Sequence, residues 1–194
     1  MAMQLEPHQS SGPAPQGPRG APADAGRGTV GVVVLTHNQR ELTCACLRSL
    51  LADQGCRTEV VLVDNGSVDG TLDEVRREFP SVAPLRSEEN LGVAGGRNLG
   101  IAHVMQSGVS YVWVVDNDTL VPAGAAGALR DYMESHPDVG IAAATVCSGD
   151  DPERVCSTGG RIRWLVGEAC HPERGTAYAA LREDERPAAA RRKR

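Results

Sequence analysis

The sequence predicts an α/β protein with a mostly parallel sheet and helices on both faces. Val-rich runs at Thr29–Leu35, Glu59–Val63 and Tyr111–Val115 are continuous, as in strands that are buried on both faces. Segments of helical periodicity alternate with these runs, which favours parallel strands joined by helices. The 194 residues fit one domain, and with only 3% aromatic residues the core must be mostly aliphatic.

Three regions are expected along the chain. Residues 1–28 are rich in Pro, Gly, Gln and Ser without apolar periodicity, which predicts a disordered segment. Residues 29–170 form the predicted domain, and the charged, Ala-rich tail 171–194 has no clear structure. The predicted helices are Gln39–Ala52, Thr71–Phe79, Gly95–Gln106 and one from Pro122 to Met133. Further strands are predicted at Val82–Arg86 and Val139–Val146, with a hairpin at Val155–Val166.

Charge and hydropathy exclude several classes of protein. A net charge of −5 argues against a general nucleic-acid binder, which needs a basic surface. No apolar run reaches the roughly 20 residues of a membrane span, and the N-terminus lacks the pattern of a signal peptide. A soluble, cytoplasmic protein is expected.

Polar clusters follow three of the predicted strands. They are Thr36-His37-Asn38, Asp64-Asn65 and Asp116-Asn117-Asp118. In open parallel sheets, ligands bind at the carboxyl ends of the strands. The clusters therefore predict a ligand site at that edge.

The carboxylates of Asp116 and Asp118 are separated by one residue and follow a hydrophobic strand. Two such acids can share Mg²⁺ or Mn²⁺, which prefer oxygen ligands, and a bound diphosphate would supply further oxygens. The alternative interpretation is an Asx-rich turn between a strand and a helix.

The cluster from Asp64 to Gly70 resembles a calcium loop only in part. Counted from Asn65 as the first loop position, the twelfth position, where a bidentate Glu belongs, is Arg76, which excludes that interpretation. Ser67 or Asp69 is expected to cap the next helix. Asp64 is expected to point into the crevice and accept hydrogen bonds from a nucleobase or ribose.

A Gly-rich segment runs from Asn90 to Asn98. Glycines before a helix let backbone amides approach an anionic ligand, and Arg97 would add a charge-assisted bond to a phosphate. The spacing fits neither a dinucleotide fingerprint nor a P-loop. The alternative is a flexible loop before a closely packed helix.

Together the runs VVVLTHN, VLVDNGSVDGT, ENLGVAGGRNLGI and YVWVVDNDT resemble the inverting family-2 glycosyltransferases of the GT-A fold, in particular the rhamnosyltransferase-like branch. The resemblance covers about Thr29 to Gly167. It implies a nucleotide-diphosphate sugar donor, an acceptor and a divalent metal, Mg²⁺ or Mn²⁺.

The resemblance also implies a role for each matching position. Thr36 and Asp64 would meet the nucleoside, and His37 stands at a base-stacking position. Asn90, Gly92 and Arg97 would line the nucleotide-sugar cleft. Asp116 and Asn117 would lie near the ribose and sugar, and Asp118, with Asp116, would bind the metal.

In the family a second half follows, with an acidic residue that deprotonates the acceptor hydroxyl. We expect the chain to lack this half, because Glu183-Asp184-Glu185 stands in Arg- and Ala-rich surroundings typical of a solvated tail. Three functions remain in view: an active glycosyltransferase, either compact or completed by a partner chain, with an oligomer also possible; a module that binds donor without transferring it; and a nucleotidyltransferase. The last is the weakest, because no Gly-rich, Lys-containing loop follows the first strand.

Overall fold

The computed structural model describes residues 28–53, 55–158, 161–163, 168–170, 175–181 and 190–191. The predicted N-terminal segment, apart from Gly28, lies outside the described residues, and so do Glu183, Asp184 and Glu185. The strands of the main sheet are β1 (Val30–Thr36), β2 (Thr58–Asn65), β3 (Ala83–Ser87) and β4 (Tyr111–Asp116). All pairs are parallel in the order β3-β2-β1-β4. The predicted parallel sheet is confirmed.

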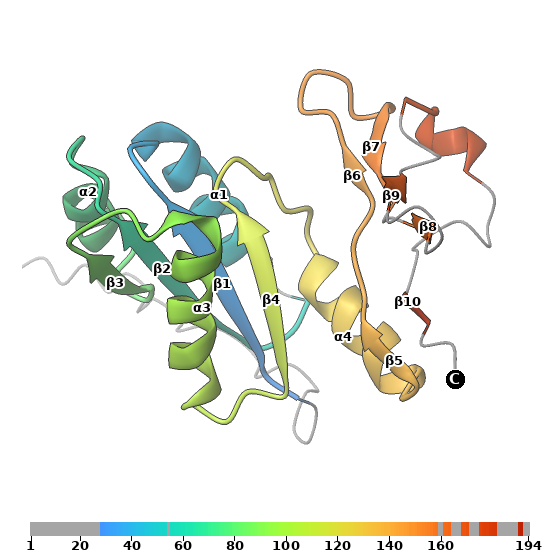
Figure 1. Cartoon of the computed structure of the whole chain (residues 1–194), viewed down its shortest axis with the longest axis horizontal. Coiled ribbons are helices and arrows are strands. Elements are labelled where there is room, and N and C mark those ends of the chain that lie inside the picture. The colour runs from blue at the N-terminus through green and yellow to red at the C-terminus, as the bar shows by residue number, and fades with distance from the viewer. Residues whose placement is uncertain are drawn as a thin grey trace, which may run out of the picture.

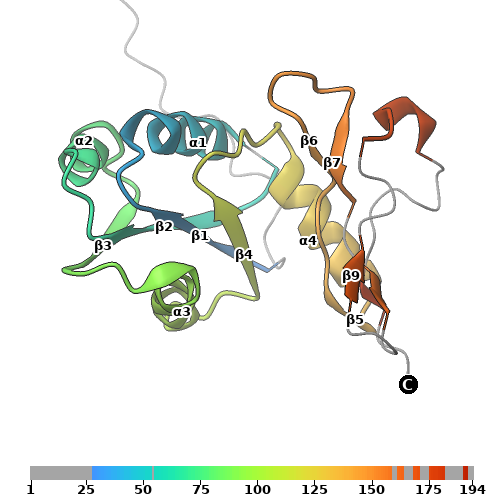
Figure 2. The same cartoon turned by 45° about the horizontal axis from the view of Figure 1, so that its top comes forward.

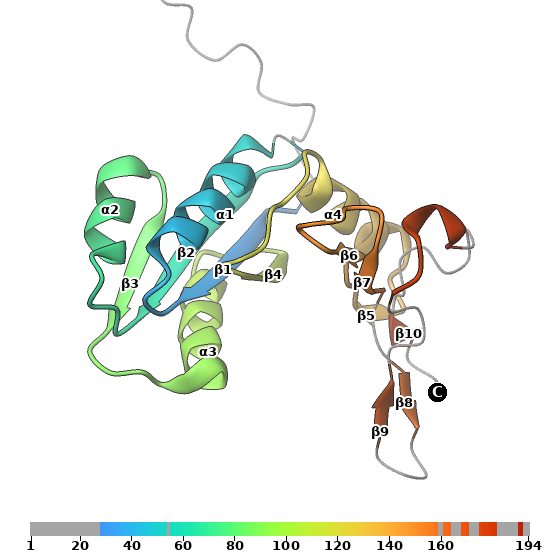
Figure 3. The same ribbon diagram turned by 90° about the horizontal axis from the view of Figure 1, so that it is seen from above.

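Helices cover both faces of this sheet, as predicted. They are α1 (Arg40–Ala52), α2 (Thr71–Glu78), α3 (Gly92–Met105) and α4 (Ala125–Ser135). Helices α1 and α2 lie on one face and α3 on the other (Figures 2 and 3). Helix α4 follows β4 and lies beside it, away from β1 (Figure 1).

The core is split between the two faces. Val32 and Val34 belong to the larger cluster, which includes Leu47 and Leu50 of α1. Val33 points the other way and packs with Val63 and Val104. Because successive side chains of a strand alternate between faces, a continuous Val run serves both clusters, and all three of these valines are fully buried.

Helix α3 packs closely on the sheet through glycine. A Cβ at Gly100 would overlap with the side chain of Val33 and would lie 2.9 Å from Val63 Cγ2. The helix also begins three residues before the predicted start, because the Asn90 side chain accepts the Gly92 N–H at 2.8 Å. Helix α4 begins later than predicted, at Ala125 after Gly124 with φ +85°.

The segment after α4 forms short antiparallel pairs, and two predictions there are wrong. The predicted strand Val139–Val146 is two strands, β5 (Val139–Ile141) and β6 (Val146–Cys147). The predicted hairpin Val155–Val166 does not pair with itself: β7 (Val155–Ser157) pairs with β6, and β8 (Arg161–Arg163) pairs with β9 (Glu168–Cys170). The remaining elements are the 3-10 helix η1 (Tyr178–Ala180) and β10 (Ala190–Arg191), which pairs with β5. Strands of two or three residues are too short for alternation to indicate their partners.

Within the described residues, no helix is both long enough and apolar enough to cross a membrane.

Candidate functional site

The carboxyl ends of β1, β2 and β4 lie at one edge of the sheet (Figure 1). The strand register places Thr36 beside Asp64 and Leu35 beside Asp116. The polar clusters predicted after these strands therefore meet at one edge. The predicted site residues lie at this edge, but their side chains differ in solvent exposure.

Thr36, at the end of β1, and Asn117, just after β4, are buried and both contact α1. The Thr36 hydroxyl lies 2.7 Å from the hydroxyl of Thr43, and Thr36 is 1% exposed. The Asn117 amide donates to Gln39 Oε1 at 2.8 Å and to Thr43 Oγ1 at 3.1 Å. Both side chains thus serve the packing of the edge, beneath its surface.

Asp64 is fully buried in an ion pair. One carboxylate oxygen accepts the Ser67 N–H at 3.0 Å, and the other accepts Arg86 Nη1 at 3.0 Å. Arg86 lies directly opposite Asp64 in the β2–β3 register. The carboxylate therefore fixes both the turn after β2 and the side chain of Arg86.

His37 lies on the surface at the turn between β1 and α1, where it is exposed. Its Nδ1 lies 2.9 Å from the Asn65 carbonyl and its Nε2 lies 3.2 Å from Asn38 Nδ2. A carbonyl only accepts, so Nδ1 carries the proton and Nε2 accepts from Asn38. Asn38, at φ +55°, also accepts the Val68 N–H at 2.7 Å. The imidazole is therefore held at the rim by the turns after β1 and β2.

Asn65 holds the loop that leads into α3. Its side chain accepts the Leu91 N–H at 2.9 Å and donates to Asn90 Oδ1 at 2.8 Å and to the Gly92 carbonyl at 3.2 Å. Gly92 has φ +70°, a conformation that a side chain disfavours, and space around it is open. Asn90 and Gly92 are exposed, so this loop lies at the surface beside the start of α3.

Arg97 of α3 forms an ion pair with Asp116 at the end of β4. The Asp116 side chain is 64% exposed and that of Arg97 is 35% exposed. Asp118 is exposed too, and among the described residues it has no hydrogen-bond or ion-pair partner. Two carboxylates and one guanidinium thus gather at the surface of the edge.

This group fits a divalent cation that also takes ligands from a bound molecule. Asp116 and Asp118 supply the carboxylate oxygens that Mg²⁺ and Mn²⁺ prefer. In the part of the chain that the structure describes, no group of three or more His, Cys, Asp or Glu residues is placed to hold a metal. The remaining ligands would have to be water or phosphate oxygens.

A thiol lies beneath the Asp116–Asp118 turn. Cys46 of α1 is fully buried and its Sγ donates to the Asp116 carbonyl at 3.6 Å. Burial first, and then the negative charge of Asp118, raise the pKa of this thiol from 9.0 to about 12. The thiol therefore stays neutral, and it supports the turn.

Two carboxylates that were not predicted as site residues anchor the starts of helices, Asp69 at the carboxyl edge and Asp53 at the far end of α1. Asp69 accepts the N–H of Thr71, the first residue of α2, at 3.0 Å and that of Arg40, the first residue of α1, at 3.2 Å. Asp53 is buried and accepts the N–H groups of Gly124 and Ala126 at 2.7 and 2.9 Å. Of the two residues expected to cap α2, Ser67 and Asp69, it is Asp69 that binds the first N–H of the helix. The bond from Asp69 to α1 and the role of Asp53 depend on tertiary placement.

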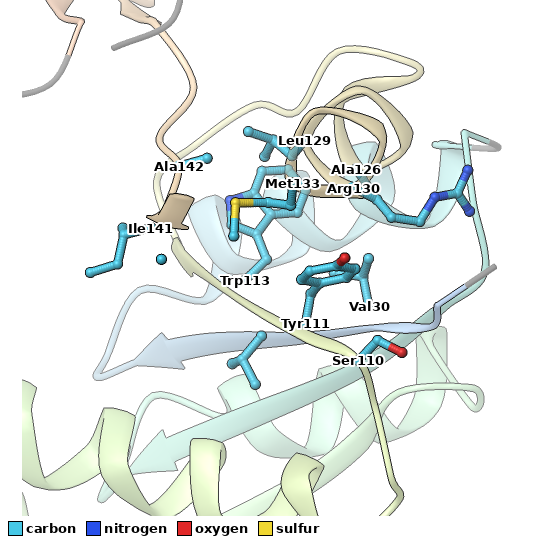
Figure 4. A pocket seen from close by; sticks show the side chains of 12 residues that line it. Val30, Ser110, Tyr111, Trp113, Ala126, Leu129, Arg130, Met133, Ile141 and Ala142 are labelled. Atoms are coloured by element: carbon cyan, nitrogen blue, oxygen red, sulfur yellow. The ribbon is translucent and has the colours of Figure 1, made fainter. Parts of the chain in front are cut away.

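A pocket of about 360 Å³ lies elsewhere, at the amino-terminal ends of β1 and β4. It is lined by Val30, Tyr111 and Trp113 from these strands and by Leu129 and Met133 from α4 (Figure 4). None of the predicted site residues lines it. The described residues therefore offer an open surface at the carboxyl edge and a mostly apolar pocket at the opposite ends of the strands.

Comparison with protein families matches residues 31–164 to the family described as Glycosyl transferase family 2. Among curated relatives, the galactofuranosyltransferase GlfT1 of Mycobacterium tuberculosis is 32% identical over 134 residues, which are 66% of this chain and 42% of the relative. GlfT1 of Mycolicibacterium smegmatis is 30% identical over 63% of this chain and 41% of the relative. The chain thus spans about two fifths of the length of the relatives it matches.

Solved structures show the same fold. The mannosyltransferase PcManGT from Pyrobaculum calidifontis, in complex with GDP-Man and Mn²⁺, aligns with a TM-score of 0.57 and 29% identity over 68% of this chain and 39% of that chain. S. aureus TarS 1-349 in complex with UDP-GlcNAc aligns with a TM-score of 0.51 and 26% identity over 57% of this chain and 33% of that chain. The sheet and its helices are therefore arranged as in these two structures.

Proposed function

The chain belongs to glycosyl transferase family 2, and from that premise we propose that it binds a nucleotide-diphosphate sugar at the carboxyl edge of its sheet and takes part in transfer of the sugar. The observation that carries the proposal is the surface group of Asp116, Asp118 and Arg97, placed beside the start of α3. A solved relative is bound to GDP-Man and Mn²⁺, which supports a donor and a cation of this kind. Sugar, nucleotide base and acceptor are left open in this proposal.

Residues of this chain would bind the negatively charged diphosphate of the donor, directly or through the cation. Asp116 and Asp118 would hold the cation, and Arg97 would donate to a diphosphate oxygen. A bound divalent cation would supply positive charge that stabilises the departing nucleoside diphosphate. The first turn of α3 adds the positive end of a helix dipole.

The nucleoside would lie over the turns after β1 and β2. His37 is exposed and its ring is held by Asn65 and Asn38, so it can present a face for a base to stack on. Thr36 and Asp64 are buried, so we propose that they support the nucleoside site from below rather than through an exposed side chain. Asp64 would do so by holding Arg86 and the Ser67 turn in place.

Calorimetry with UDP and GDP in the presence of Mn²⁺ tests the proposal. Asp118→Asn keeps the size of an exposed side chain and removes one carboxylate charge, so diphosphate affinity in Mn²⁺ should fall at least tenfold while the melting temperature stays unchanged. Asp150→Asn, also at an exposed position, is the matched control and should bind as the wild type does. Equal affinity of wild type and Asp118→Asn would contradict a cation site at this turn.

Binding and transfer are separate questions for this chain. Release of free nucleoside diphosphate from UDP- and GDP-sugars, measured with and without the acceptors of related enzymes, reports transfer or hydrolysis. Tight donor binding with no turnover would favour the alternative function, a donor-binding module that requires further residues for transfer. Failure to bind any nucleotide would contradict both functions.

A further inference from the structure

The ion pair between Arg97 and Asp116 occupies one of the two carboxylates that would hold a cation. Arg97 reaches Asp116 through Nη2. Asp118, two residues further on, has no ion-pair partner among the described residues. The pair therefore cancels one of the two negative charges on this surface when no other ligand is bound.

The contact with Asp116 leaves part of the Arg97 guanidinium without a hydrogen-bond acceptor. Arg97 Nε, the guanidinium nitrogen beside Nη2, is shielded from water and has no hydrogen-bond acceptor among the described residues. A guanidinium binds carboxylates and phosphates best through two parallel N–H bonds. A diphosphate oxygen that bridged Nε and Nη2 would satisfy both groups, which Asp116 in its present position does not do.

We propose that Arg97 is an exchangeable counter-ion of the cation site: it holds Asp116 and weakens cation binding until a diphosphate takes the guanidinium and frees the carboxylate. This inference rests on the proposed function. It makes cation and diphosphate bind with positive coupling, because each favours the arrangement in which Arg97 has left Asp116. A cation without nucleotide would bind weakly.

The opposite role predicts the opposite sign. If Arg97 only fixed Asp116 in the correct position for a cation, its removal would weaken cation binding. If it is a competing counter-ion, its removal exposes a second carboxylate and strengthens cation binding. The affinity for the cation alone therefore separates the two roles.

The experiment titrates Mn²⁺ without nucleotide and follows the electron paramagnetic resonance signal of free Mn²⁺. The variants are wild type, Arg97→Gln and Arg48→Gln. The last removes the same charge from an exposed ion pair with Glu78 and controls for the change in net charge. We expect the Mn²⁺ dissociation constant to fall roughly three- to tenfold in Arg97→Gln, the range expected for a unit charge near the surface, and to stay unchanged in Arg48→Gln.

A double variant assigns the effect to the pair. Asp116→Asn combined with Arg97→Gln should lose the gain in Mn²⁺ affinity, because the freed carboxylate is gone. Thermal melts of all variants establish that each is folded. An unchanged or weaker Mn²⁺ affinity in Arg97→Gln, or no Mn²⁺ binding in any variant, would overturn the inference.

A second titration adds UDP or GDP. In the wild type the nucleotide should lower the Mn²⁺ dissociation constant. The ratio of the Mn²⁺ dissociation constant without nucleotide to that with nucleotide should be smaller in Arg97→Gln than in the wild type. An equal ratio in both proteins would overturn the exchange step. If neither nucleotide binds the wild type, the proposed function fails, whereas the Mn²⁺ titration still reports whether Arg97 screens Asp116.

Discussion

The carboxylate of Asp53 accepts the backbone N–H of Gly124 at 2.7 Å, joining the end of α1 to the start of α4 across 71 positions of the chain. It also accepts the N–H groups of Gly55 and Ala126. Hydrogen bonds to a charged group contribute about 1.5–3 kcal/mol, and loss of this acceptor leaves buried donors unpaired. We expect Asp53→Ala to lower the free energy of unfolding by about 3 kcal/mol in urea denaturation. Asp150→Ala, at an exposed position, should change it by less than about 0.5 kcal/mol; equal effects would show that the Asp53 bonds add nothing to stability.

Asn65 connects the edge of β2 to the loop before α3. In Asn65→Ala the Leu91 N–H loses its acceptor, so the loop should open more often. Amide hydrogen exchange at Leu91 is expected to become about tenfold faster, equivalent to about 1.4 kcal/mol of local stability. Asn98→Ala, at an exposed position on α3, should leave that exchange rate unchanged. Unaltered protection of Leu91 in Asn65→Ala would mean that the loop is held by other contacts.

Gly100 sets how closely α3 approaches the sheet. Gly100→Ala would place a methyl group against Val33 and Val63, and such overpacking costs about 1–3 kcal/mol. The intrinsic preference of a helix for Ala over Gly, up to about 1 kcal/mol, acts in the opposite direction. We expect net destabilisation, measured by urea denaturation. Gly149→Ala, where a Cβ meets open space, is the control, and a Gly100→Ala protein as stable as wild type would contradict the close packing.

Because of Cys46, we expect the free energy of unfolding to fall as the pH rises through the alkaline range. Its pKa is raised from 9.0 to about 12 in the folded protein, so the unfolded chain releases the thiol proton first. The stabilising contribution is fully present below about pH 9 and decreases by about 1.4 kcal/mol per pH unit up to about pH 12. Cys46→Ala should flatten the fall of unfolding free energy over this range, whereas Cys156→Ala, at an exposed position, should not. The same slope in wild type and Cys46→Ala would contradict this role.

Much of the sheet could be predicted because its signals are local. Val32, Val33 and Val34 stand in one uninterrupted run, and a strand covered on both faces requires that pattern. The short strands after α4 had no such signal. Whether β7 pairs with β6 or with the segment that follows it depends on a bulged register of two residues, which side-chain alternation does not encode.

The site could be predicted as a set of neighbouring loops but not as a set of contacts. The rule for parallel sheets places the turns after β1, β2 and β4 at one edge whatever their side chains. That Asp64 is buried against Arg86 follows from the register of β3 on β2, which neither segment specifies alone. Likewise, the local sequence around Asp53 accounts only for its bond to the Gly55 N–H, whereas its bonds to Gly124 and Ala126 exist because the start of α4 packs beside it.

Asn117 divides the Asp-Asn-Asp turn into two kinds of position with different tolerance for change. Its amide is fixed on Gln39 and Thr43, whereas its two neighbours face solvent. A library that randomises positions 116 and 118 would therefore vary the charge of the rim without disturbing the scaffold. One that randomises position 117 would mostly yield proteins that lack the buried bonds from this turn to Gln39 and Thr43. Selection for new cation or donor preferences in this protein can thus vary the outer two positions together, provided that the middle one is kept constant.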